Sequence, residues 1–390
     1  MYRIKTLNKI SSAGLHHLDK SRFQVGNDVE NEDGILVRSA QMHDYEFPDA
    51  LRAIARAGAG TNNIPIDRCS EAGIVVFNTP GANANAVKEL VLAALLISSR
   101  DVLGGAEWVQ EQIHTPNVDL AAAVEKNKSA FTGPELRHKV LGVIGLGAIG
   151  ALVANDALKL GMDVYGYDPY LSVEAALRLD RHVHVIKDMN ELLRVCDYIT
   201  IHVPYLPSTK DLINEEAISK MKGNVRVLNL ARGELVCDDD MIAALESGRV
   251  AKYITDFPNE KIAAVKNVIA LPHLGASTPE SEENCAVMAV RELEDYLVNG
   301  NIRNSVNLPD LAQEWSGLSR LCLIHKNVPA MLTNIMTTLS DDGINVENMT
   351  NKSKKDYAYT MVDVNTRITD EVANELRAIP GVIRVRVLNH

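Results

Sequence analysis

The chain has 390 residues, of which 46% are hydrophobic and 23% charged, and its formal net charge is −11. This length allows two or three domains with cores of their own, and the composition is typical of a globular protein. The acidic balance, with no block of lysine or arginine to offset it, argues against nucleic acid or an anionic membrane surface as a partner.

The five cysteines are widely spaced and form no CxxC pair, which argues against a disulfide framework and against a zinc site. The N-terminal sequence lacks the apolar core of a signal peptide, and no apolar run reaches the roughly 18 residues of a membrane span. We therefore expect a cytoplasmic protein without a structural metal.

The N-terminal part alternates short apolar runs with amphipathic or turn segments. Strands are expected at Gly34–Val37, Ala53–Ala57 and Ile74–Phe77. Buried parallel strands with helices between them would make an α/β unit. The following stretch, Ala86–Arg100, predicts a helix that is apolar on most of its surface.

A strand, a glycine turn, a helix and a second strand follow in order over Val140–Tyr167. Gly145 allows the tight turn, Gly147 lets the backbone approach a pyrophosphate, and Gly150 lets helix and strand pack closely. Asp168 follows the second strand, where its carboxylate can accept hydrogen bonds from ribose hydroxyls and repel a 2′-phosphate. Such a turn alone also occurs in unrelated sheets, but strand, helix and acid together predict an NAD site.

The alternation of strands and helices continues beyond this unit. Further strands are expected at Tyr198–Val203, Val225–Leu230, Val250–Thr255 and Val268–Leu271. The pattern predicts an open, doubly wound parallel sheet, which binds its ligand at the carboxyl ends of the strands. Residues just past those ends are therefore candidates for a site: His202, Val203, Pro204, Ala231, Arg232, Asp256 and His273.

Three of these strand-end residues, together with Glu260 in the loop after Asp256, have side chains suited to interconverting an alcohol and a ketone beside a carboxylate. The guanidinium of Arg232 can hold a carboxylate through two hydrogen bonds, and His273 can take a proton near neutral pH. Glu260 can hydrogen-bond and orient His273, although a solvated acid at a helix start is also compatible with its position. Asp256 can accept a hydrogen bond from the nicotinamide carboxamide.

A long helix is expected from Pro279 to Gly300, followed by a linker at Asn301–Pro309. The remaining segments then have the order strand, helix, strand, strand, helix, strand. They are expected at Arg320–Ile324, Pro329–Leu339, Ile344–Met349, Tyr357–Val364, Thr369–Ile379 and Val382–Leu388. This order predicts a small ferredoxin-like module.

The motifs VLGVIGLGAIG, LNLARGELV, ITDFPNE and LPHLGAST, in this order, resemble those of the D-isomer-specific 2-hydroxyacid dehydrogenases. The C-terminal module resembles an ACT domain. This resemblance implies two Rossmann-like doubly wound domains followed by a ferredoxin-like ACT regulatory domain at 313–390. The nucleotide domain, 86–282, would be inserted into a substrate domain made of 1–85 and 283–312.

By position in the motifs, Arg232, Glu260 and His273 correspond to the family's catalytic arginine, glutamate and histidine. The resemblance implies cofactor contacts at Gly147, Ala148, Ile149, Asp168, Ala231, Asp256 and Gly275. The glycine turn and the strand end add Gly145, Gly150, His202, Val203 and Pro204 to the expected cofactor site. The resemblance also implies substrate contacts at Arg38, Ser39 and Asn83. One departure lies in the loop, where Phe257 directly follows the aspartate and Lys261 replaces the usual proline.

The implied activity is NAD-dependent oxidation of a D-2-hydroxy acid. The expected substrate is 3-phospho-D-glycerate, oxidised to 3-phosphooxypyruvate at the entry to L-serine biosynthesis, with Arg38 as the first candidate for binding its phosphate. A glyoxylate or hydroxypyruvate reductase, and a non-enzymatic dinucleotide-sensing corepressor, are the alternatives.

The resemblance to an ACT domain implies an amino-acid effector, and L-serine is the first to test. The candidate contacts are His325, Asn327 and Asn345, while Ala330 stands where the pattern favours glycine. A purely oligomerising module is the alternative. We expect a homodimer or a homotetramer.

Overall fold

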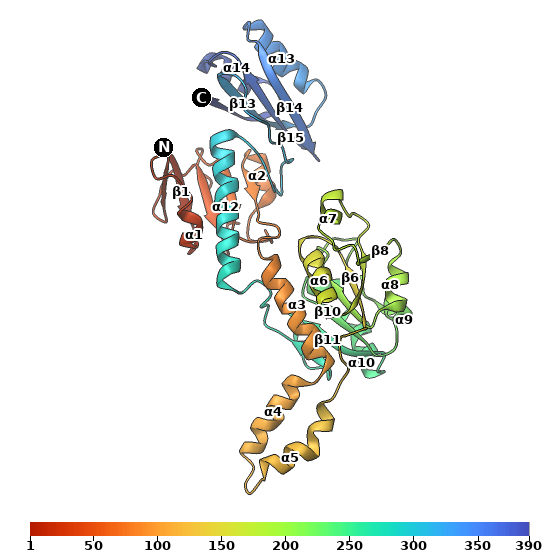
Figure 1. Ribbon diagram of the computed structural model, residues 1–390. Coiled ribbons are helices and arrows are strands. Elements are labelled where there is room, and N and C mark those ends of the chain that lie inside the picture. The colour runs from red at the N-terminus through yellow and green to blue at the C-terminus, as the bar shows by residue number, and fades with distance from the viewer. Residues whose placement is uncertain (390) are drawn as a thin grey trace. The chain divides into compact units, whose positions relative to one another are not determined.

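The computed structural model describes residues 1–389, which form two compact units (Figure 1). One unit joins Met1–Asn83 to the chain from Pro279 onward, and the other is Ala84–Thr278. The fold is mixed α/β, with two parallel sheets and one small antiparallel sheet. In the described part of the chain, no helix is long and apolar enough to cross a membrane.

The first unit begins with a parallel sheet of order β2-β1-β3-β4-β5. Its strands are β1 (Tyr2–Thr6), β2 (Phe23–Gly26), β3 (Gly34–Val37), β4 (Ala53–Arg56) and β5 (Val75–Phe77). Its helices are α1 (Ser12–Leu15), α2 (Ile66–Glu71) and the long α12 (Pro279–Asn299). The apolar face of α12 packs on this sheet through buried side chains that include Leu293 and Tyr296. A segment late in the sequence therefore completes the N-terminal core.

The second unit contains a seven-stranded parallel sheet of order β12-β11-β10-β9-β6-β7-β8. Its strands are β6 (Val140–Ile144), β7 (Asp163–Tyr167), β8 (His184–Ile186), β9 (Tyr198–Ile201), β10 (Val225–Asn229), β11 (Val250–Thr255) and β12 (Val268–Ala270). Its helices include α3 (Ala84–Ser99), α6 (Ala148–Lys159), α7 (Val173–Leu177), α8 (Met189–Val195), α9 (Glu215–Lys220), α10 (Asp238–Glu246) and α11 (Glu260–Ala263). Two apolar clusters form its core, which confirms the doubly wound sheet.

A helical hairpin extends from the second unit and was not anticipated from the sequence (Figure 1). It consists of α4 (Val102–Ile113), α5 (Leu120–Asn127) and the short 3-10 helix η1 (Lys128–Phe131). None of these helices has a buried residue. Trp108 of α4 packs on Phe131 of η1, with ring centroids 5.7 Å apart, so the hairpin covers part of its own apolar surface.

The C-terminal module is an antiparallel sheet of order β14-β15-β13-β16 with two helices, which confirms the expected βαββαβ order. Its elements are β13 (Ser319–Lys326), α13 (Met331–Asp341), β14 (Val346–Lys354), β15 (Tyr357–Val364), α14 (Asp370–Ala378) and β16 (Val382–Asn389). Inner residues of the sheet and both helices form one cluster. Other sheet residues, including Cys322 and Tyr359, belong to the same core as α12.

Buried polar contacts join this module to the end of α12. Arg386 donates to the carbonyl oxygens of Tyr296 and Leu297, at 3.2 and 2.8 Å, and the hydroxyl of Tyr359 donates to Gly300 O at 2.6 Å. Because the last carbonyls of a helix have no partner within it, these contacts satisfy groups that would otherwise need water. The module therefore caps the helix.

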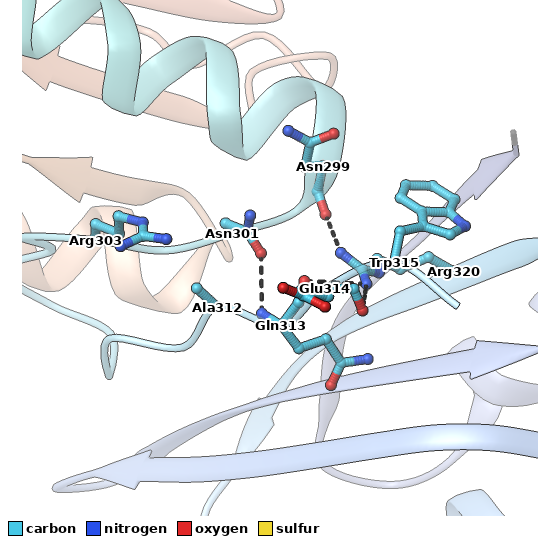
Figure 2. A pocket seen from close by; sticks show the side chains of 8 residues that line it. All are labelled: Asn299, Asn301, Arg303, Ala312, Gln313, Glu314, Trp315 and Arg320. Carbon is cyan, nitrogen blue, oxygen red and sulfur yellow. Dashed lines mark hydrogen bonds between the residues drawn. The ribbon is translucent and has the colours of Figure 1, made fainter. Parts of the chain in front are cut away.

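Figure 2 shows the linker side of the same junction. The guanidinium of Arg320 donates to the carbonyl of Asn299 at 2.9 Å and forms a fully buried ion pair with Asp363 at 2.6 Å. A cavity of about 340 Å³ lies beside it. Its lining is Asn299, Asn301, Arg303, Ala312, Gln313, Glu314, Trp315 and Arg320. Both side chains of this ion pair are almost completely buried, so removing either partner would leave a buried charge uncompensated.

Glu292 is a buried carboxyl within α12, with 7% of its surface exposed. Asn304 donates to its Oε1 at 2.7 Å, whereas Oε2 has no hydrogen-bond partner among the described residues. Burial raises its pKa to about 8, with a hydrogen bond from Asn304 acting against this and the charge of Asp310 adding to it. The folded protein therefore holds a proton here at neutral pH.

We predict that Glu292→Gln makes stability less dependent on pH. The unfolded chain ionises this group near 4.5 and the folded chain near 8, so its contribution to stability is lost as pH rises through that window. Between pH 6 and pH 9 the parent should lose roughly 1–4 kcal/mol more than the variant. Urea unfolding at both pH values measures this, with the exposed Glu283→Gln as control; identical pH slopes for parent and Glu292→Gln would contradict it.

Candidate active site

The turn after β6 depends on glycine at two positions. Gly145 has φ of 92°, and a Cβ built there would lie 2.6 Å from the carbonyl oxygen of His202. A Cβ on Gly150, in the first turn of α6, would lie 1.9 Å from Gly145 O. Any side chain at either position would force the strand, turn and helix apart. The close packing expected from the sequence is therefore present.

The space in front of this turn suits a phosphate. Gly147 is the N-cap residue of α6 and has no side chain to cap the helix. A Cβ built on it would meet nothing within 4 Å. Ala148 and Ile149 follow as the first residues of the helix, whose N–H groups have no intrahelical partners. Such an N-terminus attracts anions through these donors and the helix dipole.

Asp168 lies at the end of β7 and is fixed beside the turn. Its Oδ2 accepts the N–H of Leu146 and its Oδ1 accepts the N–H of Tyr170, both at 2.9 Å. Each carboxylate oxygen can accept a further hydrogen bond. The side chain can therefore receive ribose hydroxyls while keeping its orientation.

Asp256 follows β11 and is 1% exposed. Its Oδ2 accepts the N–H of Gly275 at 3.2 Å, and its Oδ1 is buried with no partner among the described residues. Burial is the main cause of its raised pKa, which the hydrogen bond from Gly275 opposes. An orphaned acceptor in this position fits the N–H of a carboxamide, as the nicotinamide assignment requires.

His202, followed by Val203 and Pro204, closes the end of β9. Its Nε2 pairs with Thr200 Oγ1 at 2.9 Å, and its Nδ1 is enclosed without a hydrogen-bond partner in the described chain. Burial lowers the pKa of His202 to about 3, so this imidazole is neutral at physiological pH. The open phosphate turn, Asp168 and these unpaired atoms together fit a bound dinucleotide.

Arg232 is placed by a residue that the sequence analysis missed. Asn229, fully buried at the end of β10, donates to the carbonyl of Arg232 at 2.8 Å and accepts the N–H of Ala231 at 3.3 Å. The Arg232 side chain is exposed, and its Nη1 donates to Ala231 O at 2.6 Å. In the sequence, the sign of this role was Asn229 itself, a polar residue at the end of the largely apolar strand VRVLN.

His273 lies in the loop after β12 with an unusual φ of 52°. Its ring lies against Phe257, with centroids 4.5 Å apart, and the guanidinium of Arg232 lies 5.5 Å from the centre of the same phenyl ring. Within residues 1–389, no hydrogen bond or ion pair joins His273 to Glu260, which is exposed at the start of α11. The structure thus brings Arg232 and His273 together around a residue that sequence reasoning did not single out.

The candidate substrate residues belong to the first unit. Asn8 Oδ1 accepts the N–H groups of Arg38, Ser39 and Ala40, at 3.2, 3.0 and 2.8 Å. Asn8 therefore shapes the loop after β3, a role that its sequence position alone did not indicate. The Arg38 guanidinium pairs with Glu282 at 2.8 Å. Asn83, the third candidate, is partly exposed and ends the N-terminal segment of this unit.

The candidate effector residues do not share one environment. His325 is 2% exposed, and its ring nitrogens pair with Lys326 O and Thr360 Oγ1, both at 2.8 Å. Asn327 and Asn345 are exposed, and their side-chain amides donate to Lys355 O and Glu347, respectively. His325 therefore has no ring nitrogen left for a ligand as the module stands, whereas the two asparagines remain accessible.

Comparison with known proteins agrees with this geometry. Residues 92–275 match the family model described as the NAD binding domain of D-isomer specific 2-hydroxyacid dehydrogenases. D-3-phosphoglycerate dehydrogenase of Haemophilus influenzae is 32% identical over 98% of this chain and 94% of its own length. The enzyme of that name from Methanocaldococcus jannaschii is 32% identical over 81% of this chain, which spans 59% of that longer protein.

A solved structure gives the same picture. The NAD⁺-bound 3-phosphoglycerate dehydrogenase of Entamoeba histolytica superposes with a TM-score of 0.61 and 26% identity, over 80% of this chain and 99% of that one. The chain therefore belongs to the D-isomer specific 2-hydroxyacid dehydrogenase family, and its second unit is an NAD-binding domain.

Proposed function

We propose that this protein oxidises 3-phospho-D-glycerate to 3-phosphooxypyruvate with NAD, the first step of L-serine biosynthesis. One observation carries the proposal furthest. The strands of one parallel sheet bring four features to the same edge, at their carboxyl ends. These features are the phosphate turn, the carboxylate of Asp256 with its unpaired Oδ1, Arg232 and His273. The near full-length similarity to proteins named D-3-phosphoglycerate dehydrogenase supports this substrate.

The residues at this edge divide the chemistry among them. Arg232 holds the substrate carboxylate and polarises the neighbouring carbon–oxygen bond through its paired N–H donors. His273 takes the proton of the C2 hydroxyl, which a neutral imidazole can do near pH 7. NAD, when bound, supplies the two-electron oxidation. Glu260 belongs to the proposal by its motif position, as the carboxylate that supports His273 once it carries the proton.

The substrate phosphate needs further cations and hydrogen-bond donors. Arg38 is the first candidate because its guanidinium is partly exposed, and Ser39 and Asn83 accompany it by motif position. Arg38 pairs with Glu282 in the present structure, so phosphate binding exchanges one anion for another. Because an exposed ion pair contributes little to stability, replacing Glu282 by phosphate as the partner of Arg38 costs little free energy.

For the C-terminal module we propose an ACT-like regulatory role with L-serine as effector. The accessible Asn327 and Asn345 support contacts with an amino acid, and His325 supports the module from within through its paired ring nitrogens. Ala330, at φ of 63°, adopts a left-handed conformation just before α13. The methyl group of Ala330 leaves less room for a ligand beside the start of α13, which disfavours tight binding of serine.

We also propose that the protein assembles as a homodimer or homotetramer. The hairpin formed by α4 and α5 supports this, since Val102, Leu103 and Ile113 on α4 are 42–55% exposed. Apolar side chains gathered on one projecting element favour association.

The substrate assignment predicts unequal effects in the active site. With 3-phospho-D-glycerate and NAD, His273→Gln should lower turnover on the order of 10²-fold or more, because the proton acceptor is lost. Arg232→Lys should mainly raise KM, because an ammonium cannot reproduce the planar fork of donors. A spectrophotometric assay of NADH formation, run beside a panel of other 2-hydroxy acids and, in reverse, glyoxylate and hydroxypyruvate, provides the measurement.

The same panel separates the alternatives. Preference for glyoxylate or hydroxypyruvate would identify a reductase of small 2-oxo acids. A chain that binds NAD but turns over none of the acids would contradict the enzymatic proposal and favour a dinucleotide sensor.

Cofactor choice should depend on Asp168. We predict a strong preference for NAD over NADP, because the carboxylate accepts ribose hydroxyls and repels a 2′-phosphate. Asp168→Ala should weaken NAD binding and reduce the difference in affinity between NAD and NADP. Calorimetric titration with both dinucleotides tests this, and equal affinities in the parent protein would exclude the role given to Asp168.

Serine regulation is tested by titrating L-serine to millimolar concentration while following activity and binding heat. Inhibition of the parent and a weaker response in Asn327→Ala are expected, because the variant lacks the exposed amide. Asn374→Ala, in α14 of the same module, is the control. No inhibition and no heat in the parent would leave the module as an assembly element or as a sensor of another ligand.

A further inference from the structure

Phe257 contacts the two side chains to which the proposed reaction assigns the largest roles. Its ring centroid lies 4.5 Å from that of His273, with 47° between the ring planes. The guanidinium carbon of Arg232 lies 5.5 Å from the centre of the phenyl ring. One aromatic side chain is thus shared by a histidine and an arginine that come from different loops.

The backbone fixes where this ring can lie. Asp256 is buried and held by Gly275, and Phe257 follows it at once, with its N–H donating to Thr255 Oγ1 at 3.1 Å. A Cβ built on Gly233 would lie 3.5 Å from Cβ of Phe257. The loop after β10, which carries Arg232, therefore passes directly against Phe257.

The residues on either side of Glu260 are bonded to α10. Asn259, the N-cap of its short helix, donates to Asp238 at 2.6 Å, and Lys261 pairs with Asp239. Both partners lie in the first turn of α10. In the described chain the ring contact of His273 is with Phe257, and no carboxylate is hydrogen-bonded to the imidazole.

We infer that Phe257 is a positioning residue that holds the His273 imidazole and the Arg232 guanidinium in register for the reaction. The inference rests on the proposed function, because it assigns no chemistry to Phe257 itself. Aromatic rings prefer tilted contacts at this separation, and a guanidinium is attracted to a phenyl face. Losing the ring would free both side chains at once.

Two ring-free variants, Phe257→Leu and Phe257→Met, and one ring-retaining variant, Phe257→Tyr, test the kinetic role in the full-length protein. Both ring-free variants should lower kcat about 10-fold and raise KM for the hydroxy acid, since small misplacements of reacting groups are costly. The calorimetric affinity for NAD should stay unchanged, and Phe257→Tyr should remain near the parent. Phe131→Leu is the matched control, because Phe131 contacts Trp108 in the hairpin instead.

A second readout does not depend on turnover. Histidine labelled with ¹³C at Cε1 gives one NMR signal per residue, and His273→Gln assigns the signal of His273. The ring current of Phe257 should displace that signal, Phe257→Leu and Phe257→Met should abolish the displacement, and Phe257→Tyr and Phe131→Leu should preserve it. If no acid of the panel is oxidised, the proposed function fails, and this signal still decides whether the phenyl ring orders the imidazole.

Four results would overturn the inference. An unmoved His273 signal in the ring-free variants would mean that the two rings are not in contact in solution. Parent-like kcat and KM in these variants would remove the functional role. Loss of NAD affinity together with activity, or equal damage in Phe257→Tyr, would assign Phe257 to the packing of the NAD-binding domain.

Discussion

The contact between the first turn of α6 and the turn after β6 sets the position of the groups proposed to hold NAD. Gly150 and Gly145 meet with no room for a Cβ, and Gly145 also lies against the backbone of His202. In the same turn, the N–H of Leu146 donates a hydrogen bond to the carboxylate of Asp168. The phosphate turn, the ribose acceptor and the end of β9 are therefore fixed together, and a methyl group at either glycine would displace all three.

Much of the fold follows from hydrophobic patterning. The strands of the second unit are short apolar runs because both faces of a parallel sheet are covered, and α12 and the C-terminal module were located by their periodicity. The N-terminal strands β1 and β2 were missed because YRIKT and FQVG mix polar with apolar residues and are only partly buried. The hairpin of α4 and α5 was also missed, since Gly104 and Gly105 lower the helix propensity of α4.

The candidate site could be proposed from the sequence where it depends on topology. Parallel strands bring their carboxyl ends to one edge, so Asp168, Arg232 and Asp256 could be named from their order alone. Through-space contacts between loops were not predictable. The tilted contact of Phe257 with His273 involves a left-handed backbone at His273, and the roles of Asn8 and Asn229 depend on how each loop folds back on its strand.

The capping of α12 by the C-terminal module has a mechanical consequence. Side chains of the module hold the last carbonyls of this helix, while Glu282, in its first turn, holds Arg38. With 21 residues, the helix is a stiff strut about 30 Å long. A displacement of the module would therefore be transmitted along α12 to Glu282, the ion-pair partner of Arg38 in the loop after β3.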